Sequence, residues 1–198
     1  GFSHKDFQGN PKPVILTGYE TKGSLTEYIK SAKEGNSDIN YHYNDTQKLI
    51  HLYIISAAMS HLHCNKIIHG HLKPNNILIN DQYNPIITDF LFKKLNRQYQ
   101  NNYLESNTKD KRTIIYLPPE VIFDSQYSKA GDVYSFSMIA YQIVSGDEPF
   151  NNCSYDEVLD KLKNGERPEF NFSISAPLKK LIEKCWSQEP SNRPTFSK

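Results

Sequence analysis

A periodic pattern of apolar and polar positions in the first third of the chain predicts a buried helix. Its apolar side chains recur at steps of three or four residues: Leu49, Leu52, Ile55, Met59 and Leu62. Such steps place side chains on one face of an α-helix, which we expect to face a hydrophobic core. Asn44 and Asp45 precede the pattern and can cap the helix N-terminus. The apolar run is interrupted by histidine and serine, and it is too short to span a bilayer.

Two shorter apolar runs predict strands. The first, Ile77–Ile79, ends at the turn-forming pair Asn80–Asp81, and the second covers residues 86–88. Residues 30–44 contain a glycine and many polar side chains, so we expect a loop there. Residues 96–111 are polar and rich in amides, with little periodicity, which predicts a second long and mobile loop. The chain as a whole is expected to be mainly helical with a few short strands.

Composition and charge exclude several classes of function. The chain has 198 residues, 37% of them hydrophobic and 23% charged, which is enough for one well-buried core. A net charge of +1 gives no electrostatic argument for binding nucleic acid or membrane, and the short basic run at Lys93, Lys94 and Arg97 fits a solvated loop. Three cysteines without C-x-x-C spacing argue against a disulfide framework and a zinc site. We therefore expect a cytoplasmic globular protein.

Residues 69–76, with the sequence HGHLKPNN, carry the most informative motif. They resemble the protein-kinase catalytic loop H-R-D-L-x-x-x-N, in which the Asp receives the proton of the substrate hydroxyl and the Asn holds Mg²⁺. Three positions match, including Asn76. Gly70 replaces the Arg, and His71 replaces the catalytic Asp. The chain thus resembles a kinase that lacks its general base, as in a pseudokinase.

Further landmarks of the same family follow in the family's order. Asp89-Phe90-Leu91 stands where kinases carry Asp-Phe-Gly, and Leu117–Glu120 resembles the A-P-E end of the activation segment. Asp132–Phe136 resembles the start of the central buried helix. Cys185–Trp186 and Arg193–Phe196 resemble the last helices of tyrosine kinases and their serine/threonine relatives. The resemblance implies an α+β, mainly α, protein-kinase-like fold.

The start of the chain resembles the junction between the two lobes of a kinase. Val14–Glu20, followed by Gly23-Ser24-Leu25 and a helical pattern, is similar to the last small-lobe strand and the hinge. By this resemblance, residues 1–23 are the end of the small lobe and the hinge. Residues 24–198 are then the large lobe, and the rest of the small lobe is missing from the chain.

The resemblance also assigns candidate ligand-binding residues. Four of them would form an adenine site: Thr17 at the gatekeeper position, Gly18, Glu20 and Leu78. Asn76 and Asp89 are the two residues that would hold Mg²⁺, and Lys73 matches the lysine that serine/threonine kinases use near the transferred phosphate. ATP and Mg²⁺ are therefore candidate ligands of a full-length parent. No cofactor is required for a binding function, and these side chains could also serve only to satisfy loop amides.

Departures from the family pattern lie next to the retained residues. His71 could accept a proton, but its ring is bulkier than an aspartate and repels Mg²⁺ when protonated, so we interpret it as a space-filling loop residue. Gly70 removes the Arg that would pair with a phosphate on Thr108 or Thr113. Leu91 replaces a glycine and should restrict the backbone of its segment. All three changes favour loss of catalysis.

Several retained residues are expected to be structural. In the family, Glu120 and Arg193 would form a buried ion pair, and Asp132 would accept hydrogen bonds from catalytic-loop amides; Trp186 also has a structural place. Retention of this framework favours a folded module that binds a protein partner or acts allosterically, with no role in binding nucleic acid or membrane. Two alternatives stay open. The chain could be part of an active serine/threonine or tyrosine-like kinase that needs its missing small lobe, or an incomplete gene product.

One surface expectation follows from the missing lobe. The resemblance places four side chains near the junction with the small lobe: Thr17, Tyr19, Leu78 and Phe90. Without that lobe they would form an exposed apolar patch, which marks an interaction site or a tendency to self-associate.

Overall fold

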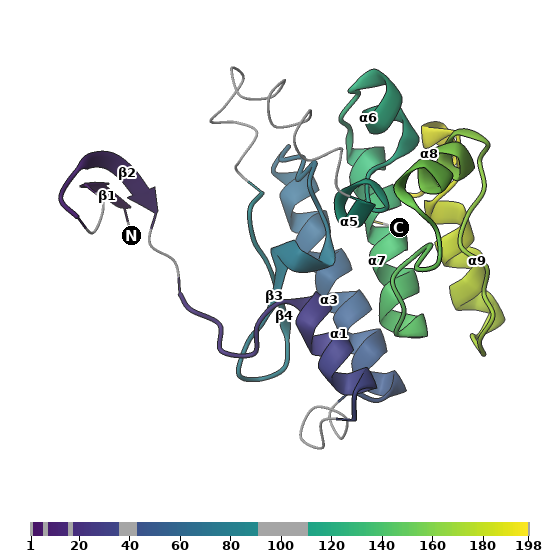
Figure 1. The fold of residues 1–198 in the computed structure, drawn as a ribbon, viewed down its shortest axis with the longest axis horizontal. Helices are drawn as coiled ribbons and strands as arrows, with labels where there is room; N and C mark the ends of the chain where they lie inside the picture. The colour runs from purple at the N-terminus through teal and green to yellow at the C-terminus, as the bar shows by residue number, and fades with distance from the viewer. Residues whose placement is uncertain (1, 6–7, 16–17, 36–42, 91–110, 198) are drawn as a thin grey trace.

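The computed structural model describes residues 2–5, 8–15, 18–35, 43–90 and 111–197 (Figure 1). Its strands are β1 (Phe2–Lys5), β2 (Pro11–Ile15), β3 (Ile77–Ile79) and β4 (Pro85–Ile87). Its helices are α1 (Leu25–Lys33), α3 (Asp45–Cys64), α5 (Lys111–Ile114), α6 (Pro119–Asp124), α7 (Lys129–Ser145), α8 (Tyr155–Lys163) and α9 (Ala176–Cys185), with short 3-10 turns at Pro74–Asn76 and Pro190–Asn192. The expected α+β, mainly helical architecture is confirmed.

The strands form two separate antiparallel hairpins. β3 pairs with β4, with Ile77 opposite Ile87, and this hairpin lies against α3. Both strands were predicted, and the second begins one residue earlier than expected. Figure 1 shows the β1–β2 hairpin set apart from the helices, to which residues 18–24 lead back before α1 begins.

Helix α7 forms the centre of the helical part. It is buried on nearly its whole circumference, and helices α3 and α9 pack against it (Figure 1). Ser128 caps its N-terminus by accepting a hydrogen bond from the Gly131 amide at 3.0 Å. At the C-terminus, Gly146 has φ +76°, a left-handed conformation that glycine adopts without steric cost. A helix that is buried on nearly all sides belongs to the core, and this one brings Asp132 into that core.

Helix α3 confirms the predicted helix but shows a different buried face. Asn44 caps it, accepting a hydrogen bond from the Gln47 amide at 3.0 Å. Leu49, expected in the core, is 54% exposed, whereas His51 and His63 are buried. Each buried imidazole has a hydrogen-bond partner far along the chain, which makes the burial of a polar ring tolerable. The prediction for Leu49 was wrong because the two histidines take the inward positions.

Helix α1 corrects the start of the first expected loop. Its capping box is complete: the Glu27 amide donates to the Ser24 hydroxyl, and the Glu27 carboxylate accepts from the Ser24 amide. The helix then runs to Lys33, so the loop expected over residues 30–44 begins only after this helix. Residues 36–42 lie outside the described residues, as do Leu91, the basic run at 93–97 and nearly all of the expected loop at 96–111.

The structure describes three of the four side chains expected in the apolar patch. Phe90 packs against the hydrophobic core, and Leu78 is half-buried within β3. Tyr19 is 88% exposed, and Thr17 lies outside the described residues. Phe90 is half-buried as well, so the patch stays a prediction. Within the described ranges, the chain has no helix that combines the length and the hydropathy needed to cross a lipid bilayer.

Candidate functional site

The loop at residues 69–76 is held by a carboxylate from the first turn of α7. Asp132, which is 1% exposed, accepts hydrogen bonds from the His69 amide at 2.9 Å and the Gly70 amide at 2.7 Å. Its Oδ2 also lies 2.9 Å from Nε2 of His63, near the end of α3. The expected role of Asp132 is confirmed. His63 was missed, because no spacing in the sequence connects it with a residue 69 positions away.

His69 ties the same loop to the β3–β4 hairpin. Its Nδ1 accepts a hydrogen bond from the His71 amide at 3.3 Å, so the ring proton must be on Nε2, which donates to the Thr88 carbonyl at 3.0 Å. Burial lowers the pKa of His69, although the nearby Asp132 carboxylate opposes that shift in part. His69 therefore acts as a neutral connector between the loop and β4.

His71 and Asn76 are in direct contact. The Asn76 amide nitrogen Nδ2 donates to the His71 carbonyl oxygen at 2.8 Å, which fixes the orientation of the side-chain amide. The same nitrogen lies 3.1 Å from His71 Nδ1. Because Nδ2 carries hydrogens only, Nδ1 must be the acceptor, and the proton of a neutral His71 ring must be on Nε2. Neither ring nitrogen of His71 then offers a lone pair to a substrate hydroxyl.

Lys73 faces the segment just before α6. Its ammonium group donates a hydrogen bond to the hydroxyl of Thr113 at 3.1 Å, and Thr113 is only 3% exposed. The Thr113 side chain is thus buried and engaged. Thr108, the other candidate, lies outside the described residues. Sequence reasoning had no means to pair Lys73 with a residue 40 positions further on.

Asp89 and Asn76 lie close to one another at the end of the β3–β4 hairpin. The Thr88 amide donates to the Asn76 carbonyl at 2.9 Å, which places Asp89 one residue beyond this contact. Asp89 is exposed and has φ +63°, a left-handed conformation that is uncommon outside glycine and often found at functional sites.

These two side chains fit the donor set of a magnesium site. Because Asn76 Nδ2 is turned toward His71, its oxygen is the atom left for a metal, and Asp89 supplies a carboxylate. Mg²⁺ commonly binds through one or two carboxylates together with water and phosphate oxygens. Within the described ranges there is no cluster of three or more His, Cys, Asp or Glu side chains that could hold a metal. The magnesium assignment therefore stays a prediction that depends on a bound nucleotide.

The structure describes three of the four adenine-site candidates. Leu78 is half-buried and pairs with Ser24, and the next amide, of Ile79, donates to the Gly23 carbonyl at 2.9 Å. The end of the segment that precedes α1 thus lies beside β3. Gly18 is exposed, Glu20 is half-buried, and Thr17 lies outside the described residues. The adenine site stays a prediction.

An ion pair connects α6 with the C-terminal segment. Arg193 binds Glu120 through two contacts, of 2.6 Å and 2.9 Å, and its guanidinium also donates to the Ser187 carbonyl. The Arg193 side chain is fully buried, and it lies over the ring of Tyr134. The expected buried pair is confirmed.

Comparison with known proteins agrees with this geometry. The profile of the family described as protein tyrosine and serine/threonine kinase matches residues 6–198. The chain belongs to the protein kinase superfamily. The resemblance of its loop and helices to this family, noted in the sequence, is confirmed.

Relatives of this kinase-family chain come from a plant, an amoeba and a virus, Acanthamoeba polyphaga mimivirus. The serine/threonine-protein kinase VIK of Arabidopsis thaliana is 33% identical over 191 residues, which cover 93% of the chain. The RGS domain-containing serine/threonine-protein kinase A of Dictyostelium discoideum is 30% identical over 96% of the chain. The serine/threonine/tyrosine-protein kinase HT1 of Arabidopsis thaliana is 28% identical over 94% of it. The chain spans 42%, 16% and 45% of the lengths of these relatives, and 11% of a further Dictyostelium relative.

Proposed function

We propose that this kinase-family chain is the hinge and large-lobe part of a pseudokinase. In this proposal it transfers no phosphate and acts as a module that binds a protein partner or transmits an allosteric signal. The coarse assignment rests on the family match and the mainly helical fold. The finer assignment rests on the loop at residues 69–76.

The observation that carries the proposal is the contact between His71 and Asn76. A general base must present a lone pair within hydrogen-bond reach of the proton that it abstracts. In His71, Nδ1 already accepts a hydrogen bond from Asn76, and Nε2 carries the proton of the neutral ring. Proton transfer by a positioned base contributes roughly 10²–10⁴-fold to an enzyme's rate, so this arrangement removes a large part of catalysis.

The preserved framework supports a binding role. The loop keeps its anchor at Asp132, and the Arg193–Glu120 pair is intact and buried. Removing one partner of a buried ion pair leaves a buried charge without its counter-charge and destabilises the fold. Both partners must therefore be present for the fold to be stable. A domain that keeps these supports presents a stable helical surface to a protein partner.

A second candidate function is phosphoryl transfer from ATP to serine or threonine. It is favoured by the retention of Lys73, Asn76 and Asp89, and by the relatives described as serine/threonine-protein kinases. In this alternative Asn76 and Asp89 would hold Mg²⁺, which neutralises charge on the phosphates when bound. Lys73 would then have to exchange the Thr113 hydroxyl for a phosphate oxygen.

A phosphotransfer assay tests whether this chain transfers phosphate on its own. The chain is incubated with γ-labelled ATP, Mg²⁺ and generic protein acceptors, beside the variants His71→Ala and Asp89→Ala. We expect all three proteins to give label at the background level, since no side chain in the loop can take the hydroxyl proton. Incorporation by the unchanged chain that disappears in both variants would assign the base to His71 and overturn the pseudokinase proposal.

A further inference from the structure

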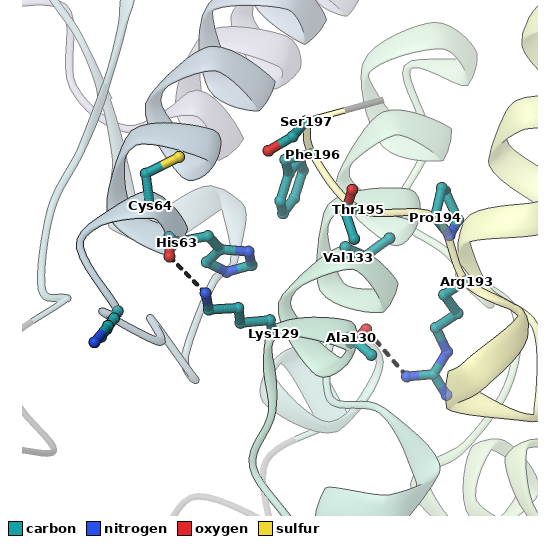
Figure 2. A pocket seen from close by; sticks show the side chains of 11 residues that line it. His63, Cys64, Lys129, Ala130, Val133, Arg193, Pro194, Thr195, Phe196 and Ser197 are labelled. Carbon is teal, nitrogen blue, oxygen red and sulfur yellow. Dashed lines mark hydrogen bonds between the residues drawn. The ribbon is translucent and has the colours of Figure 1, made fainter.

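A pocket has the character of a ligand site that is separate from the candidate magnesium and adenine residues described above. It has a volume of about 360 Å³ and lies between the end of α3, the start of α7 and the C-terminal segment (Figure 2). This volume is in the lower part of the range for small-molecule sites, roughly 300–1,000 Å³. Its lining combines an apolar wall, which includes Val133 and Phe196, with several cationic side chains.

The charge of the lining has one sign. Among the residues that the structure describes, Lys66, Lys129 and Arg193 line the pocket, and no Asp or Glu does. The Arg193 guanidinium is already paired with Glu120, so the two lysines are the cations left for a ligand. Figure 2 shows the Lys129 ammonium at the end of α3, where it donates to the His63 carbonyl at 2.5 Å. An ammonium group has three N–H donors, so this single contact leaves it able to bind an anion.

His63 gives the pocket a polar group that is already oriented. The residue is 7% exposed, and its ring packs edge-on against Phe196, with 5.2 Å between ring centroids. Nε2 is bound to Asp132, whereas Nδ1 has no hydrogen bond to any of the residues that the structure describes. The ring therefore lines the pocket with one nitrogen unused and the other fixed on a buried carboxylate.

We propose that this pocket binds a small phosphate monoester with an aromatic or aliphatic body. The phosphate lies between the Lys129 ammonium and Nδ1 of His63, and the apolar body lies against Val133 and Phe196. In one state a phosphate O–H donates a hydrogen bond to Nδ1, and in the other the imidazole has taken up that proton and its N–H donates to the phosphate oxygen. Both states place one proton between Nδ1 and the phosphate oxygen. A phosphate fits these two groups better than a carboxylate does, since a carboxylate has no such proton near neutral pH.

The site is connected to the loop through two hydrogen-bonded steps. His63 contacts Asp132, and Asp132 holds the amides of His69 and Gly70. A ligand bound to Nδ1 therefore changes the charge and position of the His63 ring. This ring orients the Asp132 carboxylate that holds the loop. This role goes beyond the function proposed above and does not depend on whether the cleft binds a nucleotide.

Protection of a cysteine tests the site directly. Cys64 lines the pocket and is exposed, Cys153 is half-buried at a different place, and burial raises the pKa of the Cys185 thiol to about 11. We expect phenyl phosphate to slow alkylation of Cys64 in a saturable way, measured by mass spectrometry, while Cys153 reacts at an unchanged rate. Benzyl alcohol, a neutral aromatic of similar size, should give no protection.

Variants identify the groups that bind the phosphate. Lys129→Met should weaken phenyl phosphate by about tenfold, as expected for loss of one hydrogen bond to a charged group, whereas Lys163→Met on the exposed side of α8 should leave affinity unchanged. Lys66→Asn provides a second variant in case Lys129→Met fails to fold. Lys66 has φ +59°, and asparagine tolerates that conformation. We expect a smaller but measurable loss for it.

One result would overturn the proposed site, and a second would overturn its connection to the loop. The first is alkylation of Cys64 that phenyl phosphate does not slow, or slows equally in both lysine variants and the Lys163→Met control. The second concerns the connection to the loop: in amide NMR spectra, saturating phenyl phosphate should move the Gly70 resonance. If Cys64 is protected and Gly70 does not move, the pocket binds the ligand but the coupling through Asp132 is refuted.

Discussion

Replacing Arg193 by alanine should lower the free energy of unfolding by about 3–5 kcal/mol, the usual cost of breaking a buried ion pair from one side. The Arg193 side chain is fully buried, and its two contacts with Glu120 are 2.6 Å and 2.9 Å long. Without the guanidinium, the Glu120 carboxylate loses its counter-charge in a largely dry environment. Carbonyl groups such as that of Ser187 lose a donor at the same time.

Denaturant unfolding of three proteins measures this effect. The unchanged chain and Arg193→Ala are compared with His71→Ala, which removes a loop side chain without stranding a buried charge, and which we expect to shift the midpoint far less. A double variant that also carries Glu120→Ala should be less destabilised than the sum of the two single variants, because the two groups interact. Small and equal shifts for Arg193→Ala and His71→Ala would mean that the pair contributes little to the fold.

The second large effect is expected at Asp132. Asp132→Ala removes the acceptor of three donors, two of them backbone amides of the loop. Each buried donor left without a partner costs about 1–3 kcal/mol, so we expect a loss of about 3 kcal/mol or more. The loop should also loosen, because His69 and Gly70 are the residues that this carboxylate holds.

Unfolding and amide hydrogen exchange test this together. Asp124→Ala, at an exposed position near the end of α6, is the matched control and should change stability by less than about 0.5 kcal/mol. Exchange of the Gly70 amide should be markedly faster in Asp132→Ala than in this control. Unchanged protection of Gly70 would show that the loop is held by other contacts, and that the connection from His63 to the loop is not the one described above.

Local sequence rules predicted one long helix and two of the strands. The helix from Asp45, its Asn44 cap and the two strands after the loop all followed from periodicity, capping and turn residues. The error at Leu49 has a specific cause. Hydropathy ranks leucine as buried and histidine as exposed, but His51 finds the Tyr83 carbonyl at 2.7 Å and so can occupy the inward position. A partner 32 residues away cannot be seen in a helical pattern.

The candidate site shows the same limit. The motif identified His71, Asn76 and Asp89 as the positions of interest, and the structure places Asn76 and Asp89 at one end of a hairpin. The motif alone could not show that the Asn76 amide turns toward His71, or that Lys73 donates to the hydroxyl of Thr113. These contacts depend on rotamers and on the three-dimensional path of the chain. They decide whether retained residue types are available for chemistry.

The central claim is that the His71 ring has no free basic nitrogen facing a substrate. Long-range ¹⁵N–¹H NMR spectra of the labelled chain measure it, because they distinguish protonated from bare ring nitrogens; the His71→Gln spectrum assigns the signals among the seven histidines. We predict, at neutral pH, a bare Nδ1 that accepts from Asn76 and a protonated Nε2. The Nδ1 signal should shift in Asn76→Ala, which removes its donor. A protonated Nδ1 with a bare Nε2, unaffected by Asn76→Ala, would contradict the account.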